Sequence, residues 1–129
     1  GVIFVKFKAI CENHLYSKAY SKGKRAVTSA LAVYILPDYA AKRLAKAHPQ
    51  KRVVNRIGLT VSKKIGHAVV RSRVKRILRE GLRQVELSNN LSKGYLIVLV
   101  ARPSCIEAKS THIARDLQKA FTALKLFNV

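Results

Sequence analysis

Apolar residues in three stretches of the chain have patterns that are typical of β-strands. Residues 26–36 are rich in branched and aromatic residues, residues 57–62 alternate with a two-residue period, and residues 95–101, YLIVLVA, form an unbroken apolar run. Alternation is typical of a strand buried on one face, whereas a continuous apolar run is typical of a strand covered on both faces. We therefore predict a sheet with 95–101 as a central strand, and with 26–36 either continuous or divided in two near Ser29.

Three other segments repeat apolar residues with the period of a helix. The first, residues 12–22, ends at Gly23, a residue that tolerates the left-handed conformation of a helix C-terminus. The second follows a turn at Gly66 and places these apolar residues on one arc: Val70, Val74, Ile77, Leu78, Leu82 and Val85. The third, from about 110 to 127, aligns Ile113, Leu117, Ala120, Phe121 and Leu124 on one face.

These elements predict a single α+β domain spanning residues 1–129. Their order is α-β-β-β-α-β-α, which gives three helices and a mixed sheet of about four strands, and 129 residues with 49% hydrophobic content can bury one core. A basic connector at 39–54 contains AAKRLAKA, which is compatible with one or two helical turns before His48-Pro49. Gly81, inside the second helix, indicates a close approach or a mild bend, because glycine otherwise costs roughly 1 kcal/mol there.

The exposed side of the second helix is almost entirely cationic. Residues 63–83 include eight Lys or Arg and one acid, Glu80, and Lys75, Arg79 and Arg83 form a stripe opposite the apolar arc. A merely solvated face usually mixes both signs to gain ion pairs, and here only Glu80 is available to make them. This density of like charge favours phosphate binding, because it repels itself unless a polyanion neutralises it.

The charge of the whole chain indicates the same class of partner. The formal charge is +20, from 26 basic and 6 acidic residues. Such a balance is typical of nucleic-acid binding, with an acidic membrane surface as the weaker competitor. The longest uncharged apolar run, residues 95–101, is far shorter than the roughly 20 residues that span a bilayer.

Groups that could cut a phosphodiester unaided are missing from the sequence. The six acids are scattered, so no carboxylate cluster for metal ions is visible, and no nucleophile and base stand together. The two cysteines, Cys11 and Cys105, lack metal-ligand spacing and are expected to pack as small apolar residues. A disulfide is the alternative, although nothing else indicates a secreted chain and cytosolic thiols stay reduced. We therefore predict a protein that binds and positions RNA, with no catalytic residue, metal or cofactor of its own.

Residues 61–80, VSKKIGHAVVRSRVKRILRE, carry a family resemblance. The segment resembles the bacterial ribonuclease P protein subunit, in which a strand ending in Ser-Lys-Lys leads through Gly into a helix with an Arg-Asn-Arg motif. Here the motif reads Arg71-Ser72-Arg73, and His67 stands where the turn usually has Asn. Both departures keep polar character, and the resemblance extends in weaker form over nearly the whole chain.

The resemblance implies a ribosomal protein S5 domain 2-like topology. In that topology the crossover from 57–62 through the basic helix to 95–101 is left-handed, against the usual right-handed preference. It also implies a cytoplasmic ribonucleoprotein in which a large RNA subunit is the catalyst and the protein assists in removing the 5′ leader of precursor tRNA. The expected partners are that RNA and precursor tRNA, with no membrane and no obligate protein partner, and the Mg²⁺ of the holoenzyme is bound mainly by RNA.

Two binding surfaces follow from these expectations. Contacts to the RNA subunit are expected from Lys63, Lys64, Arg71, Ser72, Arg73, Lys75, Arg76 and Arg79. By resemblance, a cleft between the first helix and the sheet takes the leader, and Tyr16, Tyr20 and Tyr34 map to its aromatic positions, where rings can stack on unpaired bases. Without the resemblance, core packing would be the expected role of these tyrosines.

Two other classes of protein share parts of this pattern. A ribosomal or other structural RNA-binding protein without a nuclease role would carry the same charge, but it would need no aromatic cleft on the sheet. A DNA-binding module would present a recognition helix, yet the basic helix lacks the Asn and Gln that commonly read base edges.

Overall fold

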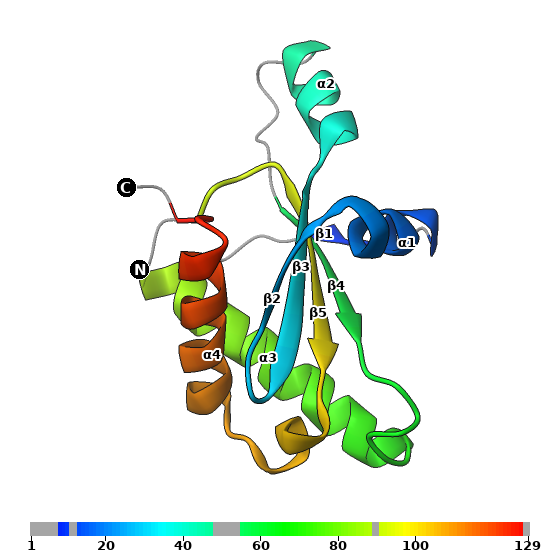
Figure 1. The fold of residues 1–129 in the computed structure, drawn as a ribbon, viewed down its shortest axis with the longest axis vertical. Coiled ribbons are helices and arrows are strands. Elements are labelled where there is room, and N and C mark those ends of the chain that lie inside the picture. Colours follow the sequence, from blue (N-terminus) through cyan, green and yellow to red (C-terminus); the bar gives the residue numbers. More distant parts are fainter. Residues whose placement is uncertain (1–7, 11–12, 48–54, 89–90, 128–129) are drawn as a thin grey trace.

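A five-stranded mixed sheet forms the centre of the computed structural model, which describes residues 8–10, 13–47, 55–88 and 91–127. The strand order is β1-β4-β5-β3-β2 (Figure 1). The strands are β1 (Lys8–Ala9), β2 (Lys24–Val27), β3 (Leu31–Pro37), β4 (Arg56–Thr60) and β5 (Tyr95–Ala101). The helices are α1 (Asn13–Lys22), α2 (Tyr39–Ala47), α3 (Ala68–Ser88), the short 3-10 helix η1 (Pro103–Glu107) and α4 (Ser110–Ala123).

The predicted α+β architecture is confirmed, with the short helix η1 added after β5 and two further elements added elsewhere. One is the two-residue strand β1, which pairs parallel to β4 at the edge of the sheet. The other is α2, which realises the helical turns expected in the connector and projects from the top of the view in Figure 1. Two predictions, on the packing of Cys11 and on the end of the connector helix at His48-Pro49, lie outside the described residues.

Strand β5 is the central strand, as its unbroken apolar sequence predicts. It pairs parallel with β4 and antiparallel with β3. Residues 96–99 of β5 are all buried, because helices cover both faces of the sheet. Helix α3 connects the parallel strands β4 and β5 (Figure 1). The hand of this crossover stays a prediction.

The strand predicted at 26–36 is divided near Ser29 into the antiparallel pair β2 and β3. Thr28 closes the turn: its hydroxyl donates to the Leu31 carbonyl oxygen at 3.0 Å. The buried carboxylate of Asp116, on α4, accepts hydrogen bonds from the Ser29 hydroxyl at 3.2 Å and the Ala30 amide at 3.1 Å. The turn is therefore held in place by α4.

Alternation along the strands sends side chains into two separate apolar clusters. The larger lies between the sheet and helices α3 and α4, and includes Leu31, Val33 and Ile35 of β3 with Ile97 and Leu99 of β5. The smaller lies beneath α1 and consists of Ile10, Leu15, Ala19, Leu36, Leu96 and Val98, with Tyr16, Tyr34 and Val100 packed against it. The predicted apolar arcs of α3 and α4 both face the larger cluster.

Two glycines owe their positions to close contacts. A Cβ on Gly81 would lie 2.5 Å from the Ile113 side chain, which confirms the close approach predicted at this point of α3. Helix α1 does end before Gly23, but the predicted left-handed cap is wrong, since its φ lies outside that region. Gly23 is required because a Cβ would lie 2.4 Å from the Ala19 oxygen and 2.6 Å from the Ile35 oxygen.

The last helix is shorter than its apolar pattern predicts. Helix α4 ends at Ala123, and Lys125 follows in the left-handed conformation with a φ of 57°. The Leu126 amide then donates to the Phe121 oxygen at 2.9 Å, which turns the chain back so that Leu126 is buried and Phe127 pairs with Leu91. None of the helices in the described ranges has the length and apolar character needed to cross a membrane.

Candidate nucleic-acid interface

The three predicted tyrosines gather on the α1 side of the sheet. Tyr16 and Tyr20 lie one turn apart on α1, and Tyr34 projects from β3. The rings of Tyr20 and Tyr34 meet edge to face, with centroids 4.9 Å apart and planes at 81°. Tyr20 is 41% exposed, whereas Tyr16 and Tyr34 are half-buried against the smaller apolar cluster. Side chains from two elements therefore form one aromatic surface, of which Tyr20 is the most accessible member.

Two rows of paired residues form the sheet beneath these rings. Because cross-strand partners share a face, the strand register gives the rows as Arg25, Tyr34, Val98 and Gly58, and then Val27, Ala32, Val100 and Thr60. Tyr16 lies directly over Gly58, and the hydroxyl oxygens of Tyr20 and Thr60 are 3.0 Å apart. Val27, at the β2 end of the second row, is 51% exposed. The aromatic surface thus rests on β4 and stays accessible toward β2.

Sequence reasoning missed Gly58 and Thr60 as members of this surface. A signal for them was present, since the alternation of Ile57, Leu59 and Val61 toward the core places Gly58 and Thr60 on the opposite face. Only the packing of α1 across the sheet shows that this face meets the tyrosines.

The predicted basic residues are contiguous in space as they are in sequence. Lys63 and Lys64 are exposed in the turn that follows β4, and the turn is closed by a hydrogen bond from the Ile65 amide to the Ser62 oxygen at 3.0 Å. Along α3, four predicted residues are exposed and two are half-buried: Ser72, Arg73, Arg76 and Arg79, then Arg71 and Lys75. We call this set, from Lys63 to Arg79, the basic surface. It begins three residues after Thr60, so it adjoins the aromatic surface at the end of β4.

Two arginines of the basic surface differ from the free, solvated cations that the sequence pattern suggests. Arg73 donates from Nη1 to the Ile106 carbonyl oxygen at 2.5 Å, which ties α3 to η1. The Nε atom of Arg71 is buried and has no hydrogen-bond partner among the described residues. A buried donor without a partner costs free energy, so a phosphate that engaged the Arg71 guanidinium would relieve that cost.

The remaining reactive groups of the described part offer no evident nucleophile. Burial raises the pKa of the Cys105 thiol from 9.0 to about 11, and a thiol with this pKa stays protonated at neutral pH. The Asp116 carboxylate already accepts two hydrogen bonds from the β2–β3 turn. Among the residues that the structure describes, no three His, Cys, Asp or Glu side chains are grouped so that they could hold a metal ion.

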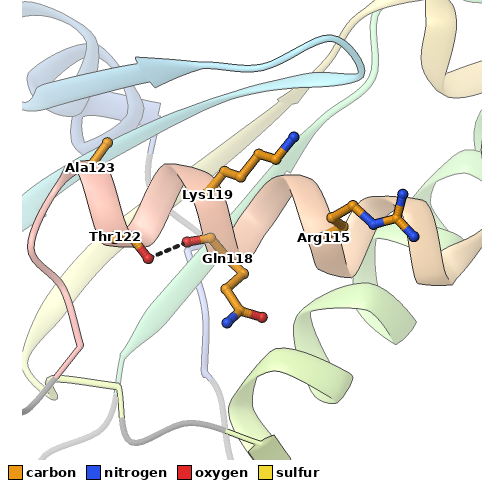
Figure 2. Close-up of a pocket in the computed structure, with 5 residues that line it drawn as sticks. All are labelled: Arg115, Gln118, Lys119, Thr122 and Ala123. Atoms are coloured by element: carbon orange, nitrogen blue, oxygen red, sulfur yellow. Dashed lines mark hydrogen bonds between the residues drawn. The ribbon is translucent and has the colours of Figure 1, made fainter.

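A hollow on α4 is separate from both surfaces. Figure 2 shows its lining, which consists of Arg115, Gln118, Lys119, Thr122 and Ala123, and its volume is about 500 Å³. All five residues belong to α4, which packs on the face of the sheet opposite α1. The Thr122 hydroxyl donates to the Gln118 backbone oxygen at 2.7 Å, so it is already engaged within the helix.

Fold and site together define a small basic α+β protein in which an aromatic sheet face adjoins a cationic turn and helix. Residues 4–125 match the family model described as Ribonuclease P. The chain is 35% identical over 117 residues to the ribonuclease P protein component of Clostridium acetobutylicum, and this alignment covers 91% of the chain and 88% of the relative. It is 32% identical over 116 residues to the component of Bacillus mycoides, with 90% of each chain covered. The chain therefore belongs to the ribonuclease P protein family.

Solved structures agree with this assignment. The RNase P protein of Staphylococcus aureus superposes with a TM-score of 0.72 at 26% identity, covering 95% of this chain and 100% of that one. The RNase P protein of Thermotoga maritima gives a TM-score of 0.66 at 18% identity, covering 87% and 93%, and supports the fold alone. Membership of this family decides against the alternative of a ribosomal protein.

Proposed function

We propose that this chain is the protein subunit of a ribonuclease P, in which it binds the catalytic RNA and the 5′ leader of precursor tRNA. In this role it assists the endonucleolytic removal of the leader in the cytoplasm. The RNA subunit supplies the catalysis, and the Mg²⁺ ions of the holoenzyme are held mainly by RNA. The observation that carries the proposal is the junction of the aromatic and basic surfaces at the end of β4.

The basic surface is suited to phosphate oxygens of a folded RNA. Its guanidinium groups offer several donors in a planar fork, and contacts of this kind position a partner without reading its sequence. Arg76 and Arg79 are exposed on α3, and Lys63 and Lys64 extend the surface into the turn. We assign this surface to the RNA subunit, because a folded RNA presents many phosphates over the length of a helix.

The aromatic surface is suited to an unpaired strand. Aromatic rings stack on any base, so they bind a single strand with little sequence preference. That property fits a leader whose sequence varies from one precursor tRNA to another. The edge-to-face contact leaves Tyr20 41% exposed, and this accessibility supports its assignment to a base rather than to the core.

The proposal is tested with Tyr20→Ala in an enzyme reconstituted with a bacterial ribonuclease P RNA. Affinity for precursor tRNA should fall by about 1 to 3 kcal/mol, the usual contribution of one stacked base, while affinity for mature tRNA should stay the same because it has no leader. Both affinities are measured by equilibrium binding. Wild-type protein without the RNA subunit should leave the precursor uncut.

Tyr39→Ala is the matched control, because Tyr39 is an exposed tyrosine on α2 outside the aromatic surface. It should leave both affinities unchanged. Equal losses for the two tRNAs in Tyr20→Ala, together with a lower melting temperature, would show that Tyr20 serves folding and not the leader.

A further inference from the structure

Gly58 is the point on β4 where the ring of Tyr16 meets the backbone. A Cβ built on Gly58 would lie 2.5 Å from Cε1, 2.7 Å from Cζ and 2.7 Å from the hydroxyl oxygen of Tyr16. Contacts below 3.0 Å force a shift, and the obstacle here is one edge of the ring together with its hydroxyl. Any side chain at this position would therefore displace Tyr16 from the sheet.

Thr60, two residues along the same face of β4, holds the second ring of α1. Its hydroxyl oxygen lies 3.0 Å from that of Tyr20, 40 residues away in the chain. The Tyr20 ring is held at its other side by Tyr34, whose plane is turned by 81°. A side chain that is 41% exposed would otherwise rotate among several rotamers. Thr60 and Tyr34 together select one orientation of Tyr20.

We propose that Gly58 and Thr60 are positioning residues for the precursor-tRNA leader, acting through Tyr16 and Tyr20. Strand β4 then sets the positions of the two α1 rings that pack on it, although neither Gly58 nor Thr60 has an aromatic ring of its own. Holding the rings in one orientation before the leader arrives removes part of the ordering cost of binding. This inference rests on the proposed function, because it takes the aromatic surface to be the leader site.

The Thr60 contact is tested by a double-mutant cycle on the reconstituted enzyme. Thr60→Val and Tyr20→Phe each remove the same hydroxyl pair, so each should lower the preference for precursor over mature tRNA by about two- to tenfold, the worth of one hydrogen bond. The double variant should lose no more than either single variant, since the two changes delete one interaction. Thr122→Val, which removes a bonded hydroxyl on α4, should leave the preference unchanged.

The Gly58 contact is tested in the same way with Tyr16. Gly58→Ala should lower the preference for precursor tRNA about as much as Tyr16→Ala, and it should have no further effect when Tyr16 is already alanine. Gly81→Ala is the control, because its Cβ would also meet a side chain at 2.5 Å, but between α3 and α4. That variant should lower the melting temperature and leave the preference intact.

The outcomes separate this inference from the proposed function. If Tyr16→Ala and Tyr20→Ala keep the full preference for precursor tRNA, the leader site is wrong and the inference fails with it. If those two variants lose the preference while Thr60→Val and Gly58→Ala retain it, the inference alone is overturned. Losses from Thr60→Val and Tyr20→Phe that multiply in the double variant would also overturn it, because Thr60 would then act independently of Tyr20.

Discussion

Arg73 is a member of the basic surface that also contributes to the fold. Its Nη1 donates to the Ile106 carbonyl oxygen, so α3 and η1 are held together by a group that could also meet phosphate. Arg76 and Arg79 are exposed on the same helix, and neither makes such a contact within the part of the chain that the structure describes. Removing Arg73 therefore mixes a loss of stability with a loss of binding, whereas removing Arg76 or Arg79 tests binding more directly.

Cys105 makes the stability of the protein depend on pH in the alkaline range. Burial raises the pKa of its thiol to about 11; the Arg73 charge lowers that pKa and the Asp116 charge raises it, both by less. The thiol of the unfolded chain ionises at a lower pH than the buried thiol, because its pKa is not raised by burial. The stability that the protonated, buried thiol contributes is therefore complete below pH 9 and is lost as pH rises through 11. By linkage the free energy of unfolding should fall by roughly 2 to 3 kcal/mol over this range.

The measurement for Cys105 is denaturant unfolding between pH 8 and pH 11.5, with Cys105→Ala as the reference. The two proteins differ only at residue 105, so the difference between the two curves isolates the thiol. A difference that does not change with pH would contradict the buried, protonated thiol.

At the scale of an element, α3 has one side buried in the core and another that is exposed and cationic. Val74, Leu78, Leu82 and Val85 are buried on one side, and the cations of the basic surface occupy much of the rest. Gly81 has no side chain, so α4 can approach α3 closely at this point. Helix α3 therefore packs against both the sheet and α4, and its cationic side stays outside these contacts. Binding of RNA to this side, as proposed above, would leave the packing of α3 on the sheet and on α4 unchanged.

The double variant Arg76→Ala and Arg79→Ala tests the function of α3. Each lost phosphate contact should reduce the slope of log affinity against log salt by about 0.7 to 0.9, giving a slope shallower by about 1.4 to 1.8 for the RNA subunit. The melting temperature should change little, because exposed like charges do not stabilise the fold. Binding is measured over a series of salt concentrations.

A matched control removes the same charge from another helix. Arg115→Ala with Lys119→Ala takes two exposed cations from α4 and should leave the salt slope nearly unchanged. An equal decrease of slope in both double variants would mean that the RNA responds to total charge and not to the basic surface.

At the scale of the whole molecule, one ion pair joins the strands on either side of β5. Arg56, at the start of β4, donates from Nε to Asp38 Oδ2 at 2.6 Å and from Nη2 to Oδ1 at 2.9 Å. Asp38 directly follows β3 and is 2% exposed, and its amide donates to the Gly94 oxygen just before β5. The pair therefore holds the end of the sheet from which α2 projects.

Arg56→Met should destabilise the protein by about 3 to 5 kcal/mol, because it removes the guanidinium from a buried carboxylate. Adding Asp38→Asn should recover part of the loss, since the buried charge is then gone as well. Denaturant unfolding measures both. Arg83→Met, which breaks the exposed pair with Glu80, should cost about 1 kcal/mol or less, and an equal cost for Arg56→Met would contradict the buried role.

Much of the fold could be predicted because its elements depend on local patterns. The apolar run of β5, the branched and aromatic residues of β3 and the apolar arcs of α3 and α4 each identify their own element, because each pattern is typical of one kind of element. The charge of the basic surface is likewise visible in sequence, because Glu80 is the one acid among the eight Lys and Arg of residues 63–83. For the tyrosines, periodicity alone favoured the core, and half-buried Tyr16 and Tyr34 partly match that expectation.

Tertiary structure decided which helices and strands pack against each other. The sequence by itself determined that Gly58 and Thr60 share a face of β4, but it carried no information that α1 would place Tyr16 and Tyr20 over that face. The end of α4 at Ala123 and the hydrogen bond of Arg73 to η1 were equally invisible. The physical reason is that periodicity specifies which side of an element is buried, whereas the identity of its neighbour depends on how distant segments pack, and packing is a property of the whole chain.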